Sequence, residues 1–119
     1  MYRISAIYNA EAGKHFDREY YLDVHVPLAF RQLKGRVNIK KFEVEWDLEQ
    51  IDWTAQSGLE KKNIMAPCRF SAIVETERDL QDFFKFMKTP DRDPLHEDVK
   101  KYTDCSMTWV ISELLEPPG

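Results

Sequence analysis

The sequence predicts an α+β fold, with a four-stranded antiparallel sheet and two helices on one of its faces. Four segments alternate apolar and polar residues, and two others carry apolar residues at helical spacing. Their order is strand, helix, strand, long connection, strand, helix, strand. A chain of 119 residues has room for one hydrophobic core, so we expect a single domain spanning residues 1–119.

The first strand is expected at residues 2–9, where the apolar side chains of one parity would face a core. A helix is expected from Asp17 to Leu33. Asp17 is a suitable N-cap, because its carboxylate can accept hydrogen bonds from the free N–H groups of the first turn. Phe16 and Tyr21 fit a hydrophobic staple around this cap.

His25 lies in the middle of this helix, on the same face as Tyr21 and Leu28, because these residues are spaced by four and three positions. Pro27 lacks the N–H that the helical ladder needs, so a kink or a break is expected near His25. Gly35 is placed to end the helix.

The second strand is expected at residues 37–47. The parity of its apolar residues changes in the middle, which predicts a β-bulge near Lys40 and Lys41. Residues 48–66 follow no regular pattern and are expected to form a long connection. This connection would fold over a cavity mouth, a partner subunit or its own core, with Trp53 and Met65 as a lid or as dimer contacts.

The remaining elements are expected in a regular order. They are a third strand at 68–76, a helix from Glu77 capped by Thr76, one or two short turns over 95–102, and a last strand at 105–115. This is the order of the ferredoxin-like βαββαβ fold, with both helices on one face of the sheet. Several strands carry apolar residues at both parities, so we expect a homodimer that buries the other face.

Composition excludes several classes of function. The net charge is −4 and no basic patch stands out, so we expect no nucleic-acid partner. The apolar runs are too short to cross a membrane and no signal peptide is evident, so we expect a cytoplasmic protein with no membrane partner. Cys68 and Cys105 are expected to be reduced structural thiols, and the histidine and cysteine spacings predict no metal site.

One run of residues resembles a known family. It reads Phe, acidic residue, aromatic pair, His-x-Pro-Leu, and consists of Phe16, Asp17, Tyr20, Tyr21, His25, Pro27 and Leu28. With the order of elements, it resembles the EthD-like members of the dimeric α+β-barrel superfamily over most of the chain. Residues 48–66 depart from the family pattern. The resemblance implies two ferredoxin-like subunits whose sheets form a barrel, with a pocket between each sheet and its helices.

The resemblance also implies a class of function. Members of this superfamily include small cofactor-free enzymes that act on aromatic or polyketide-like compounds, as cyclases, dehydratases, lactone isomerases or monooxygenases. EthD itself is named for a role in ether degradation, and other members bind haem. We therefore expect a cofactor-independent enzyme that acts on a small hydrophobic molecule by histidine acid/base chemistry. The alternatives are a non-catalytic accessory dimer that binds a hydrophobic metabolite, and a haem protein with His25 as axial ligand.

His25 is the expected catalytic residue, because an imidazole can take or give a proton near neutral pH, and Tyr21 is its expected helper. The alternative for Tyr21 is an amphipathic ring with its hydroxyl at the surface. The alternative for His25 is a core histidine that hydrogen-bonds a neighbouring tyrosine or a carbonyl freed by Pro27. His15 and His96 are expected in solvent. The expected substrate-binding residues are apolar or aromatic and suit a flat ligand, although each could also serve plain packing: Tyr8, Leu28, Phe42, Trp46, Phe70 and Trp109.

Overall fold

The computed structural model describes residues 1–54 and 58–116, and the side chains of residues 1–51 and 63–116. The strands are β1 (Tyr2–Tyr8), β2 (Lys41–Thr54), β3 (Gly58–Val74) and β4 (Met107–Glu113). The helices are α1 (Arg18–Tyr20), α2 (Val26–Leu33), α3 (Glu77–Met87) and α4 (Asp93–Asp98). A π-helical turn spans Tyr21–His25, and short 3₁₀ turns span Pro90–Arg92 and Val99–Lys101.

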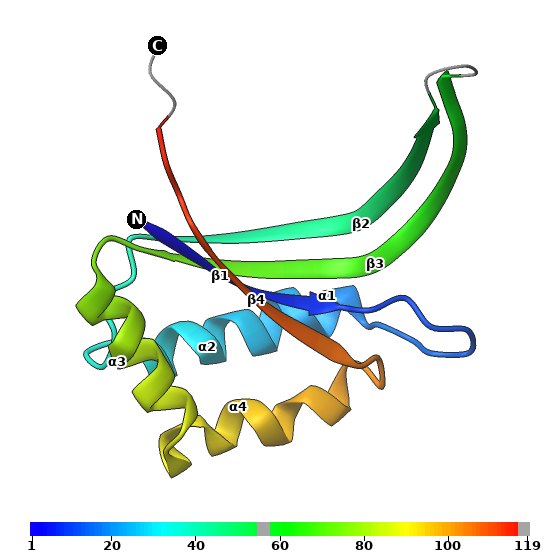
Figure 1. The fold of residues 1–119 in the computed structure, drawn as a ribbon. Coiled ribbons are helices and arrows are strands. Elements are labelled where there is room, and N and C mark those ends of the chain that lie inside the picture. Colours follow the sequence, from blue (N-terminus) through cyan, green and yellow to red (C-terminus); the bar gives the residue numbers. More distant parts are fainter. Residues whose placement is uncertain (55–57, 117–119) are drawn as a thin grey trace.

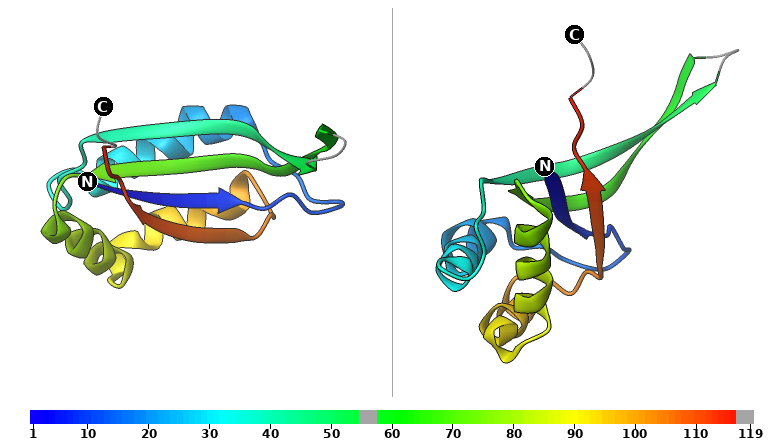
Figure 2. Two further views of the ribbon diagram at one scale, coloured as in Figure 1. Left: turned by 45° about the horizontal axis from the view of Figure 1, so that its top comes forward. Right: turned by 60° about the vertical axis from the view of Figure 1, so that its left-hand side comes forward.

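The four strands form one antiparallel sheet in the order β2-β3-β1-β4. The helices lie together on one face of this sheet (Figures 1 and 2). The predicted α+β class, with its ferredoxin-like order of elements, is therefore confirmed. None of the helices in the described part of the chain is long and apolar enough to span a membrane.

The predicted start and end of the first helical segment are confirmed. Asp17 is the N-cap and accepts a hydrogen bond from the Tyr20 N–H at 3.0 Å. The rings of Phe16 and Tyr21 lie 5.1 Å apart, as expected for the staple. Gly35 has a positive φ of 80°, which favours glycine just after a helix end.

Pro27 produces a π-helical turn at the place where a kink was expected. The N–H of Val26 donates to the carbonyl of Tyr21, five residues earlier, and α2 then begins with Pro27 near its N-terminus. Pro27 has no backbone N–H, so one hydrogen bond of the helix is missing there, and the wider π-helical turn accommodates that loss. Such turns often occur at functional sites, and this one ends at His25.

The prediction for residues 37–66 is partly wrong. Strand β2 begins at Lys41 instead of residue 37. Beyond residue 47, β2 and β3 continue over 48–54 and 58–66 as a paired two-stranded arm instead of an irregular connection. Figure 1 shows this arm leaving the body of the protein. The register shifts lie after Leu48 and after Asp52, so the bulge expected near Lys40 is misplaced. Trp53 lies outside the residues whose side chains are described.

The second half of the chain follows the prediction more closely. Thr76 caps α3 and forms a capping box with Asp79. The short turns expected over 95–102 are more regular than predicted, because α4 and the following 3₁₀ turn run from Asp93 to Lys101. This segment passes beside the first helical segment and brings distant residues to His25.

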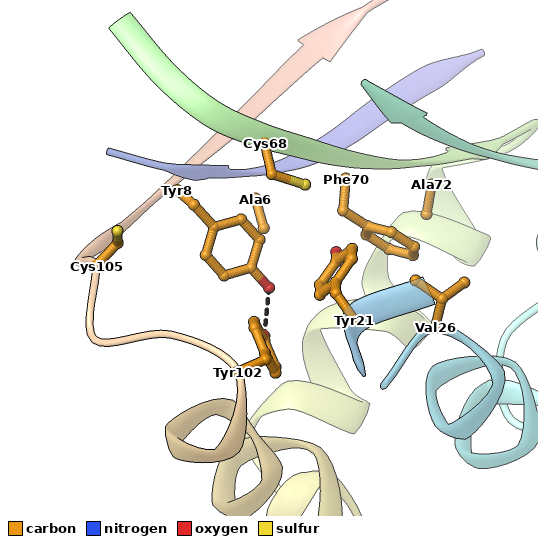
Figure 3. Close-up of a cluster of buried hydrophobic side chains, with 9 residues drawn as sticks. All are labelled: Ala6, Tyr8, Tyr21, Val26, Cys68, Phe70, Ala72, Tyr102 and Cys105. Atoms are coloured by element: carbon orange, nitrogen blue, oxygen red, sulfur yellow. Dashed lines mark hydrogen bonds between the residues drawn. The ribbon is translucent and has the colours of Figure 1, made fainter. Parts of the chain in front are cut away.

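The helix-facing side of the sheet carries two clusters of buried side chains. One is aliphatic and phenylalanine-rich and includes Ile4, Leu33, Val74 and Phe83. The other is rich in tyrosine, and Figure 3 shows its members. The second cluster is the one that carries polar atoms into the core, and it contains the candidate site.

Candidate active site

His25 is held by a carboxylate from the far end of the chain. Its side chain is buried, and Nδ1 lies 3.0 Å from Oδ2 of Asp98 in α4. The other oxygen of Asp98 accepts a hydrogen bond of 2.6 Å from the Tyr20 hydroxyl. Because a carboxylate can only accept, the imidazole donates through Nδ1–H and carries its free lone pair on Nε2.

Two tyrosine hydroxyls continue this network beyond Nε2. The Tyr102 hydroxyl lies 3.3 Å from Nε2 of His25 and 2.7 Å from the Tyr8 hydroxyl. Figure 3 shows the bond between Tyr8 and Tyr102, which come from β1 and from the segment after α4. The contact between the Tyr102 hydroxyl and Nε2 is long for a hydrogen bond and therefore weak. The lone pair on Nε2 thus accepts only a weak hydrogen bond.

Aromatic rings enclose the imidazole. The ring of Tyr21 stacks on it at a centroid distance of 5.4 Å, with an angle of 20° between the planes. The ring of Tyr102 lies 4.5 Å away on another side. Tyr21 therefore contacts His25 through its ring, while the hydrogen bonds to the imidazole come from Asp98 and Tyr102.

The surroundings fix the charge of this pair. Burial lowers the pKa of His25 below its usual value, although the hydrogen bond and charge of Asp98 act in the opposite direction. Burial alone would raise the pKa of Asp98, but the hydrogen bonds from Tyr20 and His25 outweigh it and the pKa is lowered. At neutral pH the pair is thus a neutral imidazole on an ionised carboxylate, which is the form required of a general base.

The neighbouring phenols remain protonated. Burial raises the pKa of Tyr8 to about 12 and also raises the pKa values of Tyr21 and Tyr102. Burial likewise raises the pKa of the Cys68 thiol to about 12. At neutral pH the tyrosines can therefore donate hydrogen bonds, while Cys68 is a poor nucleophile because it stays a thiol.

A cavity of about 120 Å³ opens beside His25, between the sheet and the helices. Its walls come from β1, β3, β4, the helices and the turns between them. The lining residues are Ala6, Tyr8, Tyr21, His25, Ala29, Leu33, Phe70, Phe83, Phe86, Met87, Arg92, Leu95, His96, Val99, Met107 and Trp109. Most of these side chains are apolar, as in sites for hydrophobic small molecules.

The cavity brings together some of the sequence-predicted residues. His25 and Tyr21 line it, and so do three of the expected substrate-binding residues, Tyr8, Phe70 and Trp109. The other three lie elsewhere: Phe42 packs on Phe30 and Phe70, Trp46 packs on Phe16 and Tyr21, and Leu28 is half buried away from the lining. His96 was expected in solvent, but it lines the cavity although it is exposed.

Sequence reasoning missed Asp98 and Tyr102. They are four residues apart in α4 and the turn that follows it, a spacing that places them on neighbouring turns of a helix. Both lie in a charged stretch that reads as solvated, and 73 positions separate Asp98 from His25. The four-residue spacing of Asp98 and Tyr102 does not distinguish them from other positions of this charged stretch, so the sequence carried no specific signal for either.

The cavity beside His25 is too small for a haem. Its volume of about 120 Å³ is below the roughly 300 Å³ at which sites for drug-sized ligands begin, and a haem is larger than such ligands. Among the described residues, no group of three or more His, Cys, Asp or Glu side chains could hold a metal ion.

Three solved structures have a similar fold over nearly their whole length. An EthD-like protein from Ralstonia eutropha has a TM-score of 0.64 and 17% identity, with 98% of this chain and 94% of that chain covered. An ethyl tert-butyl ether (EthD) family protein from Bacillus halodurans has a TM-score of 0.55 and 19% identity, with 97% and 99% covered. A protein from Arabidopsis thaliana has a TM-score of 0.59 and 11% identity, with 99% of each chain covered.

Comparison with protein-family models and with curated protein sequences gives no match. Identities below 20% with the solved structures establish a likeness of fold, and the functional residues of one protein do not transfer to another on that basis. The resemblance predicted from the His-x-Pro-Leu run is confirmed at this level. The chain has the ferredoxin-like α+β fold of the EthD-like proteins.

Proposed function

We propose that this protein is an enzyme that transfers protons on a small hydrophobic or aromatic molecule without a cofactor, with His25 as its general acid and base. One observation carries the proposal: an imidazole, held at Nδ1 by the buried carboxylate of Asp98, lies in the wall of an apolar cavity. A base with a lowered pKa and a fixed tautomer is the arrangement that proton abstraction near neutral pH requires.

The reaction begins at a carbon next to a carbonyl group. Nε2 of His25 takes the proton, and Asp98 stabilises the imidazolium that forms. Once Nε2 is protonated it no longer accepts from Tyr102, so Tyr102 can donate to Tyr8 and the Tyr8 proton becomes free. The enolate oxygen can then accept a hydrogen bond from Tyr8, which lines the cavity and stays protonated. The imidazolium then returns the proton to another carbon, which gives an isomerisation, or to a leaving hydroxyl, which gives a dehydration. Where the enolate carbon first attacks a second carbonyl group of the same molecule, the proton goes to the alkoxide that forms and the product is a cyclised alcohol.

The elimination of 5-nitrobenzisoxazole tests the base directly, because a base removes the ring C–H proton, the N–O bond breaks, and a coloured nitrophenolate is released. The native protein should exceed free imidazole at the same concentration. His25→Gln should lose about 100-fold or more of the rate, the range for one general base. His15→Gln is the matched control, because His15 also contacts an aspartate but is exposed, and it should keep the full rate.

An unchanged rate in His25→Gln would rule out the proposed role of this residue. The alternative function, a non-catalytic protein that binds a hydrophobic metabolite, predicts a different pattern. In that case calorimetry should show binding of the aromatic probe by the native protein and by His25→Gln, without a rate above that of free imidazole in either sample.

We also propose that the working form is a homodimer. Val110 and Ile111 of β4 are 42% and 43% exposed, and Ile51 and Ile64 of the β2–β3 arm are 48% and 49% exposed. A two-stranded arm is marginally stable in water by itself, so contact with a second copy would stabilise it. Sedimentation equilibrium at micromolar concentration should give twice the monomer mass, and a monomer would contradict this proposal.

A further inference from the structure

The cavity beside His25 has an uneven distribution of charge. Its wall includes His25, Tyr8 and Tyr21, all of them neutral at neutral pH. Its helical wall carries one fixed positive charge, Arg92, with His96 close by in the sequence. Among the described residues that line the cavity there is no aspartate or glutamate, although the whole chain has a net charge of −4.

Arg92 has no counterion within the described part of the chain. Its neighbour Asp91 pairs with Arg36 at 3.5 Å, and other arginines pair with carboxylates, as Arg69 does with Glu45 at 2.7 Å. Arg92 is half buried, yet its guanidinium forms no ion pair or hydrogen bond with a described residue. Removing a charge from water without a partner costs free energy, so this position favours an anion that comes from outside the protein.

Arg92 ends the 3₁₀ turn that leads into α4, and this turn places it in the cavity wall. Arg92 is followed at three, four and seven positions by Leu95, His96 and Val99, which also line the cavity. The cavity volume of about 120 Å³ is close to the roughly 150 Å³ that holds one benzene ring, so the body of a ligand is about the size of one ring.

We propose that the substrate is an organic anion: a ring-sized hydrophobic body that carries a carboxylate, with the carboxylate bound by Arg92. This rests on the proposed function, since it places the reacting carbon of the same molecule at His25. The planar guanidinium suits a carboxylate because it can donate two parallel hydrogen bonds to it. The apolar lining between the two ends, including Leu95, Val99 and Trp109, holds the ring.

Two pairs of probes test the charge requirement by calorimetry: phenylacetate against phenylacetamide, and 3-phenylpropionate against 3-phenylpropionamide. The native protein should bind each acid about 10- to 100-fold more tightly than its amide, as expected for hydrogen bonds to a charged group. Arg92→Gln should remove this preference. Arg92→Lys should keep part of it, because lysine retains the charge but loses the paired donors.

Arg78→Gln is the matched control, because Arg78 is exposed in α3 and its loss changes the net charge by the same amount. It should leave the preference intact. Equal affinity for acid and amide in the native protein, no binding of either acid, or a preference that survives Arg92→Gln would overturn the proposal.

The variant His25→Gln separates this inference from the proposed function. It should lose the elimination activity and keep the preference for acids, since Arg92 is intact. If the preference for acids over amides depends on Arg92 while the native protein shows no base activity, the anion site is supported and the proposed chemistry is contradicted. If base activity depends on His25 but the protein binds acids and amides equally, the proposed chemistry is supported and the anion site is contradicted.

Discussion

Two histidine–aspartate pairs in this chain have similar geometry and different surroundings. Nδ1 of His25 lies 3.0 Å from a carboxylate oxygen of Asp98, and Nδ1 of His15 lies 3.1 Å from one of Asp104. The first two side chains are 10% and 7% exposed, whereas the second two are 65% and 48% exposed. Distance therefore does not distinguish the pairs, but access to water does.

Burial gives the first pair properties that the second lacks. The pKa of His25 is lowered mainly because its charged form would lose hydration, and the rings of Tyr21 and Tyr102 supply this dry environment. The pair of His15 and Asp104 lies in water, where such contacts contribute little to stability. A search of interatomic distances for histidine–aspartate pairs would find both, and only the surroundings identify the one suited to catalysis.

The largest expected effect comes from removing the ring that shields the buried pair. Tyr21 is 1% exposed, so Tyr21→Ala should lower the free energy of unfolding by about 3–5 kcal/mol, the range for loss of a buried aromatic ring. Water would then reach His25, and its pKa should rise toward the usual value. Urea unfolding measures the first effect and NMR titration of the imidazole the second.

Tyr21→Phe is the control for this change. It keeps the stacked ring and removes only the hydroxyl, so the pKa of His25 should stay lowered. If the pKa of His25 also stayed lowered in Tyr21→Ala, the ring of Tyr21 would not be the source of the dry environment. The difference between the two histidine–aspartate pairs would then need another cause.

The second largest expected effect comes from replacing the aspartate of each pair by asparagine. Asp98→Asn should reduce the rate of base-catalysed elimination by roughly 10- to 150-fold, which corresponds to the about 1.5–3 kcal/mol of a hydrogen bond to a charged group. The amide no longer stabilises the imidazolium and can donate to Nδ1, which would move the proton to Nε2. Asp104→Asn should leave the rate unchanged, and equal losses in the two variants would contradict the assignment of Asp98.

How much of this structure the sequence predicts depends on how far apart in the chain the interacting residues lie. The cap at Asp17, the staple of Phe16 and Tyr21, and the disturbance at Pro27 each involve neighbours within a few positions, and the structure confirms all three. The order of strands and helices follows from similar local patterns. These features together predicted the fold.

The arm and the carboxylate could not be predicted in the same way. Residues 48–54 and 58–66 pair as strands through backbone bonds between β2 and β3, and their register shifts interrupt the alternation that sequence patterns depend on. Asp98 meets His25 only because α4 packs beside the π-helical turn, and nothing near either residue in the sequence indicates it. The cavity is assembled from β1, β3, β4 and several helical segments, so its lining emerges only with the tertiary structure.

The smallest effect concerns stability as the pH falls. The folded-state pKa of His25 lies below its usual value of 6.5, so between these two values the unfolded chain binds more protons than the folded one. Acidification below about pH 6.5 should therefore lower the free energy of unfolding, by at most about 1.4 kcal/mol per pH unit for this single group. Urea midpoints between about pH 7.5 and about pH 5 would measure the slope. His25→Gln should lack this contribution and His15→Gln should retain it, whereas an equal slope in both variants would show that the buried pair is not its source.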